Sequence, residues 1–221
     1  MLRQLSNSKF LIPAMIALAV LAAGTGFYIS LKQSQNQLQP DFGSSANIEG
    51  LYWPNPKQIQ DFNTLDQTGK SFGLEQLKGK WSFVFFGYTH CPDVCPITMS
   101  VMNETYKQLS TEDNNLQIIF VSVDPERDTT EKLAQYVTYF NEDFIGLGGD
   151  TEMINSLTKQ IGIAYYLNNE DQKEGYLVDH TASIFLFDAK ARLVGKLSTP
   201  HETEKIIKQF TTIKEFINAQ N

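Results

Sequence analysis

Cysteine and histidine are both scarce in this chain. Its 221 residues include two cysteines, Cys91 and Cys95, and three histidines. A structural zinc site normally takes four protein ligands, so this supply makes zinc a poor fit. A disulfide between the two cysteines would close a very short loop and constrain the unfolded chain little, so a purely structural bridge is the weakest reading of the pair.

Basic residues are in short supply as well. The chain has 18 Lys and Arg against 25 Asp and Glu, and its first 47 residues hold three of the basic and one of the acidic residues, which leaves a net charge of −9 for the rest. A domain this acidic is a poor candidate for binding nucleic acid. It suits basic partners or cations, although acidity can also serve solubility alone.

A long uncharged run occurs near the N-terminus, at residues 10–31. At about 1.5 Å per residue, 22 residues form a helix of roughly 33 Å, enough to cross a bilayer. Arg3 and Lys9 precede the run, so residues 1–9 are predicted to be cytoplasmic and the rest of the chain to lie outside. A cleaved signal peptide is the alternative, but the apolar run continues beyond the usual length of a signal core.

The remaining sequence divides into a linker and one domain. Residues 32–47 are rich in Gln, Asn and Ser and are predicted to be a flexible tether. Residues 48–221 are long enough to bury a core of their own. Because no Arg- and Ser-rich amphipathic leader precedes the apolar run, a bacterial inner membrane is the expected location, with this domain in the periplasm or outside the cell membrane.

Hydrophobic patterning in the domain predicts alternating strands and helices. Strands are expected at 62–65, 81–87, 116–123 and 144–147, and antiparallel pairs at 164–167 with 176–178 and at 183–187 with 192–197. Helices are expected at 96–110, 129–140, 151–161 and 201–219, with Asp128 and Asp150 as N-caps of the second and third. This order predicts an α/β sandwich with a mixed sheet.

The cysteine pair falls where the first central strand ends and its helix begins. That is where open α/β sheets usually place their chemistry, and a helix N-terminus there stabilises a thiolate. Two thiolates are soft donors, which select Cu(I) and also accept Cu(II). They are equally able to exchange electrons with another thiol pair, so metal binding and thiol–disulfide exchange both stay open.

A third metal ligand would most naturally be an imidazole. His90 adjoins Cys91, so its side chain should point away, and His201 is expected at the start of the last helix. His180 lies between the predicted hairpin and the next strand, and a lone histidine there is more often structural than a ligand. Met99 and Met102 are thioethers on the following helix, where their spacing favours core packing over copper binding.

Three segments resemble the motifs of the Sco/SenC family of thioredoxin-like, copper-binding proteins. They are FGYTHCPDVCP at 86–96, VSVDPERDT at 121–129 and VDHT at 178–181. They occur in the family's order and span most of the domain. The strongly polar insert at 168–175 is a departure that affects the loop near His180 and no ligand.

The resemblance implies a thioredoxin-like fold and a copper site made by Cys91, Cys95 and His180. It further implies a membrane-anchored chaperone that helps to assemble the copper centre of cytochrome c oxidase subunit II, with other copper donors or thiol reductants as further partners. Some family members instead act as thiol reductants for that subunit's cysteines, or in redox signalling. For Asp124 two readings stay open: it orients a ligand or a partner, or it merely shapes a turn.

Overall fold

The computed structural model describes residues 51–111, 114–168 and 176–219. The predicted anchor at 10–31, the flanking residues 1–9 and the tether at 32–47 lie outside this range. No helix within the described range has the length and apolar character needed to cross a membrane. Residues 48–221 separate from the N-terminal 47 as a compact unit of their own.

An eight-stranded mixed sheet runs through the domain, in the order β1-β10-β9-β4-β5-β6-β2-β3. Its strands are β1 (Leu51–Gln58), β2 (Thr64–Asp66), β3 (Ser71–Phe72), β4 (Trp81–Gly87), β5 (Leu116–Ser122), β6 (Ile145–Gly148), β9 (Ile184–Phe187) and β10 (Arg192–Leu197). Strands β4, β5 and β6 are parallel, whereas β9 pairs antiparallel with β4. A separate two-stranded sheet is formed by β7 (Tyr165–Asn168) and β8 (Leu177–His180).

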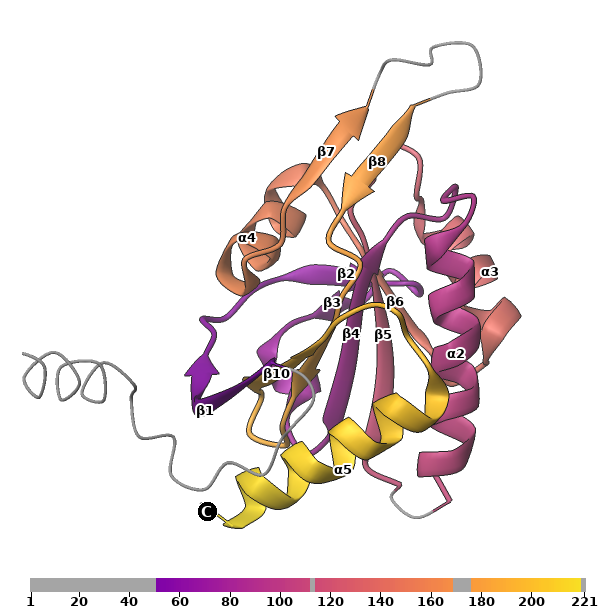
Figure 1. The fold of residues 1–221 in the computed structure, drawn as a ribbon. Coiled ribbons are helices and arrows are strands. Elements are labelled where there is room, and N and C mark those ends of the chain that lie inside the picture. Colours follow the sequence, from indigo (N-terminus) through magenta and orange to yellow (C-terminus); the bar gives the residue numbers. More distant parts are fainter. Residues whose placement is uncertain (1–50, 112–113, 169–175, 220–221) are drawn as a thin grey trace, which may run out of the picture. The chain divides into compact units, whose positions relative to one another are not determined.

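Helices cover both faces of the sheet (Figure 1). They are α2 (Val94–Leu109), α3 (Thr130–Phe140), α4 (Thr151–Ile161) and α5 (Thr203–Ala219), with a short 3-10 turn, η1, at Leu74–Leu77. Side chains of α2, α3 and α5 share one hydrophobic cluster with one face of β4 and β5, and side chains of α4 and η1 share a second cluster with the other face. The strictly buried β4 and β5 therefore form the centre of a three-layer sandwich.

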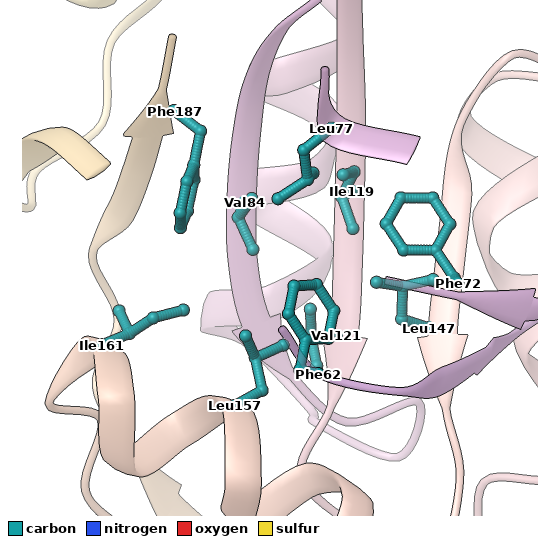
Figure 2. A pocket seen from close by; sticks show the side chains of 10 residues that line it. All are labelled: Phe62, Phe72, Leu77, Val84, Ile119, Val121, Leu147, Leu157, Ile161 and Phe187. Carbon is teal, nitrogen blue, oxygen red and sulfur yellow. The ribbon is translucent and has the colours of Figure 1, made fainter. Parts of the chain in front are cut away.

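The core on the α4 side leaves almost no room for a ligand. Figure 2 shows the apolar side chains that line this part of the core, and the space between them is about 10 Å³. Such a volume is at the lower limit for one water molecule, and its lining offers no polar partner. We interpret it as a packing gap in the core.

Most predicted elements are present, and the exceptions have local reasons. Asp150 caps α4 as predicted, since its carboxylate accepts the Met153 N–H. The prediction that Asp128 caps α3 is wrong, because Thr129 accepts the Lys132 N–H there and frees Asp128 for other contacts. The last helix begins at Thr203, two residues after the predicted start. Strand β1 was not predicted, since Pro54 and Pro56 argue against a strand; it lies at the sheet edge with an irregular register, where proline is tolerated.

Candidate metal centre

The two cysteines are placed by the junction between β4 and α2. Cys91 lies in the loop that follows β4, and its backbone N–H donates to the Tyr88 carbonyl oxygen at 3.2 Å. Cys95 is the second residue of α2. The two cysteines therefore lie on different elements, Cys91 in the loop and Cys95 in the helix. The loop folds back so that the Cys95 N–H donates to the Cys91 sulfur at 3.4 Å.

Cys95 is built into the core. It has no exposed surface and packs in the cluster formed by Phe85, Met99 and Phe120. Its sulfur approaches the end of β4 so closely that a Cβ on Gly87 would lie 2.8 Å from it and 2.8 Å from a ring carbon of Phe120. Gly87 is thus the residue that lets the sulfur sit against the strand.

His180 reaches the sulfurs from the other side, as the last residue of β8. Its ring stands edge-on against Phe85 and Tyr88, with 6.0 Å between centroids in each case. Nδ1 lies 3.3 Å from the carbonyl oxygen of Thr181, and Nε2 faces the sulfurs.

The three side chains converge on one point. The two sulfurs and an imidazole nitrogen of His180 all lie within 4.8 Å of one another, and Nε2 is 3.3 Å from the Cys95 sulfur. Both cysteines are free thiols in the structure. Two thiolates and one imidazole form a small, soft, three-donor set, which suits copper and leaves zinc short of a fourth ligand.

The pKa values of the two thiols are shifted in opposite directions. A hydrogen bond from Cys95 lowers the pKa of Cys91 to about 4, helped by His180 and by the backbone N–H groups of Asp93 and Cys95, against the opposing effect of burial. The pKa of Cys95 is raised, first because its proton is held by Cys91 and then because the side chain is buried. At neutral pH the pair therefore holds one proton between a Cys91 thiolate and a Cys95 thiol.

The site is open to solvent through a groove of about 240 Å³. The groove is lined by Tyr88, Cys91, Pro92, Asp93, Val94, Leu177, Val178, Asp179 and His180. It borders Cys91 and His180 but is not lined by Cys95. A partner that exchanges metal or electrons would therefore meet the Cys91 sulfur first.

The other candidate residues lie apart from this cluster. His90 Nδ1 is 3.1 Å from the Thr89 hydroxyl, and the His201 ring lies against Thr98 and the Leu197 carbonyl, where burial lowers its pKa. Met99 and Met102 are fully buried among apolar side chains, as the core reading predicted.

Asp124 is buried next to the site but is held by Arg127 and Tyr176. Its carboxylate accepts from Arg127 Nε, and from the Tyr176 hydroxyl at 2.7 Å. The Arg127 guanidinium lies 3.6 Å from the centre of the Tyr176 ring and 5.5 Å from that of Tyr88, which borders His180. None of the hydrogen bonds that Asp124 makes in the described structure reaches a sulfur or the imidazole.

Sequence reasoning missed several residues that shape the site. Tyr88 and Phe85 sandwich the imidazole, Gly87 makes room for the sulfur, and Asp128 bonds to the loop before Cys91. Gly87 carried a usable signal, because a glycine ending a fully buried strand often marks a close approach. The ring contacts carried none, because they depend on how the hairpin folds over β4.

Together, fold and cluster define a thioredoxin-like protein with a reduced Cys-x-x-x-Cys pair facing a histidine. The SCO1/SenC family model matches residues 54–215, and the chain belongs to this family. A relative described as a putative copper-binding protein, from Stutzerimonas stutzeri, is 35% identical over 156 residues, which cover 70% of this chain and 75% of that protein.

Solved structures agree with this placement. ScoI of Bradyrhizobium japonicum with copper bound has a TM-score of 0.63 at 32% identity, covering 71% of this chain and 98% of that one. ScoI of Arabidopsis thaliana with copper bound has a TM-score of 0.66 at 29% identity, covering 72% and 98%. The predicted family and the thioredoxin-like fold of the domain are thereby confirmed.

Proposed function

We propose that this protein is a copper chaperone that holds one copper ion through Cys91, Cys95 and His180. The observation that carries the proposal is the convergence of two sulfurs and an imidazole nitrogen within 4.8 Å. Soft thiolates favour Cu(I), and the added imidazole extends the site to Cu(II). The likeness to copper-bound relatives supports the same metal.

The recipient we propose is the copper centre of cytochrome c oxidase subunit II. Delivery requires a site that releases as well as binds, and a three-donor site beside an open groove leaves room for an incoming ligand. The Cys91 sulfur, on the residue that borders the groove, would be the atom that a recipient ligand displaces. An anchor at residues 10–31 in a bacterial inner membrane would keep the domain outside, at the level of a membrane-bound oxidase.

Thiol–disulfide exchange is the second candidate, and the split thiol pKa values favour it specifically. A Cys91 thiolate beside the groove is a nucleophile for a disulfide sulfur of the oxidase subunit or of a redox partner. Attack would form a mixed disulfide and release one partner thiolate. Cys95, after losing its proton, would then attack Cys91, which releases the second partner thiolate and leaves the Cys91–Cys95 disulfide.

One experiment separates the two functions. The copper-loaded full chain and the metal-free dithiol are each mixed with the soluble domain of cytochrome c oxidase subunit II, reduced in one sample and disulfide-bonded in the other. The copper proposal predicts that metal moves to the reduced domain, and that His180→Ala impairs the transfer. The reductase alternative predicts that the metal-free dithiol reduces the oxidised domain equally well with His180→Ala. Failure of copper to bind the full chain at one ion per chain would contradict the first proposal.

A further inference from the structure

A buried carboxylate outside the donor set holds the loop that carries Cys91. The Asp128 side chain has no exposed surface, yet no Lys or Arg forms a salt bridge with it in the described structure. Oδ2 accepts the Thr89 backbone N–H at 2.9 Å and the Ser122 hydroxyl at 2.6 Å, and Oδ1 accepts the Thr89 hydroxyl at 2.6 Å. His90 Nδ1 lies 3.8 Å from Oδ1.

These contacts join three elements at one end of the sheet. Ser122 is the last residue of β5, Asp128 lies just before α3, and Thr89 begins the loop from β4 to the cysteines. The Ser122 hydroxyl in turn accepts the Asp124 N–H at 3.1 Å, and the Asp128 N–H donates to the Asp124 carbonyl at 3.0 Å. Asp128 is therefore held through both its backbone and its side chain.

Thr89 stands two residues before Cys91, so it belongs to the short segment that carries that sulfur. Both bonds from Thr89 end on the same carboxylate, which fixes the residue in direction as well as in distance. Hydrogen bonds to a charged acceptor are also the stronger kind. We propose that Asp128 is a positioning residue that, through Thr89, aims the Cys91 sulfur at Cys95 and His180.

The copper measurement in this inference rests on the proposed function, whereas the positioning of the loop by Asp128 can be tested without copper. Loss of the Asp128 carboxylate would release Thr89 and loosen the loop without touching a donor atom. Residues that orient metal ligands from outside the donor set typically change metal affinity by about 10- to 100-fold when they are removed. Asp128→Ala is therefore expected to lower Cu(I) affinity within that range.

The chain offers a matched control in Asp188. Its side chain is also almost fully buried; it accepts hydrogen bonds from the N–H groups of Lys190 and Arg192 and forms a salt bridge with the Arg192 guanidinium. It follows Phe187, which pairs with Ser82 at the start of β4, whereas the cysteines follow the end of that strand. Asp188→Ala thus removes a buried, hydrogen-bonded carboxylate at the opposite end of the sheet, and unlike Asp128 this carboxylate is paired with an arginine.

The test compares the full chain with Asp128→Ala, Asp188→Ala, Thr89→Val and Thr89→Ser. In the metal-free chains, hydrogen exchange of the Thr89 amide and the rate of Cys91 alkylation by iodoacetamide are measured. Cu(I) affinity is then measured by competition with a chromophoric chelator. We expect faster Thr89 exchange and about 10- to 100-fold weaker Cu(I) binding with Asp128→Ala, and about 10-fold weaker binding with Thr89→Val.

Thr89→Ser keeps the hydroxyl and should bind Cu(I) within about twofold of the wild-type chain, as should Asp188→Ala. Equal effects of Asp128→Ala and Asp188→Ala on Thr89 exchange and on Cu(I) affinity would overturn the inference. If Asp128→Ala does not fold, the two Thr89 variants decide the question. Equal Cu(I) affinities of Thr89→Val and Thr89→Ser would overturn the inference. A wild-type chain that binds no Cu(I) would contradict the proposed function, while exchange and alkylation would still decide the role of Asp128.

Discussion

The two halves of the candidate metal centre are held in different ways. Cys95 belongs to the main core, where it packs fully buried under β4 and α2, and Cys91 lies in the adjoining loop after β4. His180 belongs to the separate β7–β8 sheet, which projects beyond the main sheet in Figure 1 and contributes the buried Val178 to the second hydrophobic cluster. The Cys95 sulfur is therefore fixed by the main core, the Cys91 sulfur by the loop that joins β4 to α2, and the imidazole by a small separate sheet.

Under the proposed copper function, this difference gives the two halves different tasks. The two thiolates can still bind Cu(I) when the imidazole of the hairpin is missing. An imidazole on a smaller sheet sets the preference between oxidation states, because nitrogen donors matter more to Cu(II) than to Cu(I). The following predictions test this division, from the largest expected effect to the smallest.

Replacing either cysteine should have the largest effect. Cys91→Ser or Cys95→Ser removes one of two thiolates, so Cu(I) affinity should fall by more than about 100-fold, beyond what loss of an orienting contact costs. Competition with a chromophoric Cu(I) chelator measures this. Met102→Leu is the control, since it removes a buried sulfur from the core and should leave affinity within about twofold. A large loss with Met102→Leu would show that thioethers take part.

Replacing His180 should affect the two oxidation states unequally. His180→Ala is expected to weaken Cu(II) by about 100-fold and Cu(I) by about 10-fold or less, because two thiolates still hold the softer ion. The sulfur-to-copper charge-transfer band of the Cu(II) form reports the first effect. His201→Ala is the matched control, because that ring also stands edge-on to Phe85, at 6.5 Å, but lies outside the donor set. Equal losses of Cu(I) and Cu(II) affinity with His180→Ala would contradict the proposed difference between the thiolates and the imidazole.

Gly87→Ala should damage the core-held half alone. The new methyl would lie 2.8 Å from the Cys95 sulfur, so one of the two must move; we expect about 1–3 kcal/mol of lost stability and a weaker Cu(I) site. Chemical denaturation and Cu(I) competition measure the two effects. Gly195→Ala crowds Ile213 at 3.1 Å in another part of the core and should cost stability without changing Cu(I) affinity. Unchanged Cu(I) affinity with Gly87→Ala would argue that Cys95 can shift freely.

The smallest effect concerns pH. The pKa of Cys91 is lowered from 9.0 to about 4, so the thiolate form persists as pH falls and is lost only near that value. Alkylation of Cys91 by iodoacetamide should stay nearly constant from about pH 8 to pH 6 and fall by half near pH 4, whereas an ordinary thiol loses about tenfold per pH unit below its pKa. A Cys91 alkylation rate that is already about tenfold lower at pH 7 than at pH 8 would contradict a Cys91 thiolate that shares the Cys95 proton.

The central strands and the place of the cysteine pair could be predicted from local sequence. The all-buried strands β4 and β5 show as continuous apolar runs, and the cysteine pair follows the first of them directly. Asp150 was recognised as a cap because its contacts are local. The proposed ligand role of His180 depends on a resemblance to a family, because 85 residues separate it from Cys95.

What could not be predicted depends on contacts that are distant in sequence. Asp128 reads as a helix cap, yet it bonds to Thr89, 39 residues earlier, because Thr129 takes the capping position. For Asp124 the sequence leaves two readings open, orienting a ligand or a partner and shaping a turn, and its side-chain bonds go to Arg127 and to Tyr176, 52 residues away. Short-range patterns cannot show which of two adjacent polar residues turns inward.

X-ray absorption at the copper edge tests the central claim most directly. For the full chain loaded with one equivalent of Cu(I), the account predicts two sulfur donors and one imidazole nitrogen, with the nitrogen lost in His180→Ala and retained in His201→Ala. A copper ion bound by a single sulfur, or an imidazole signal that survives His180→Ala, would contradict it.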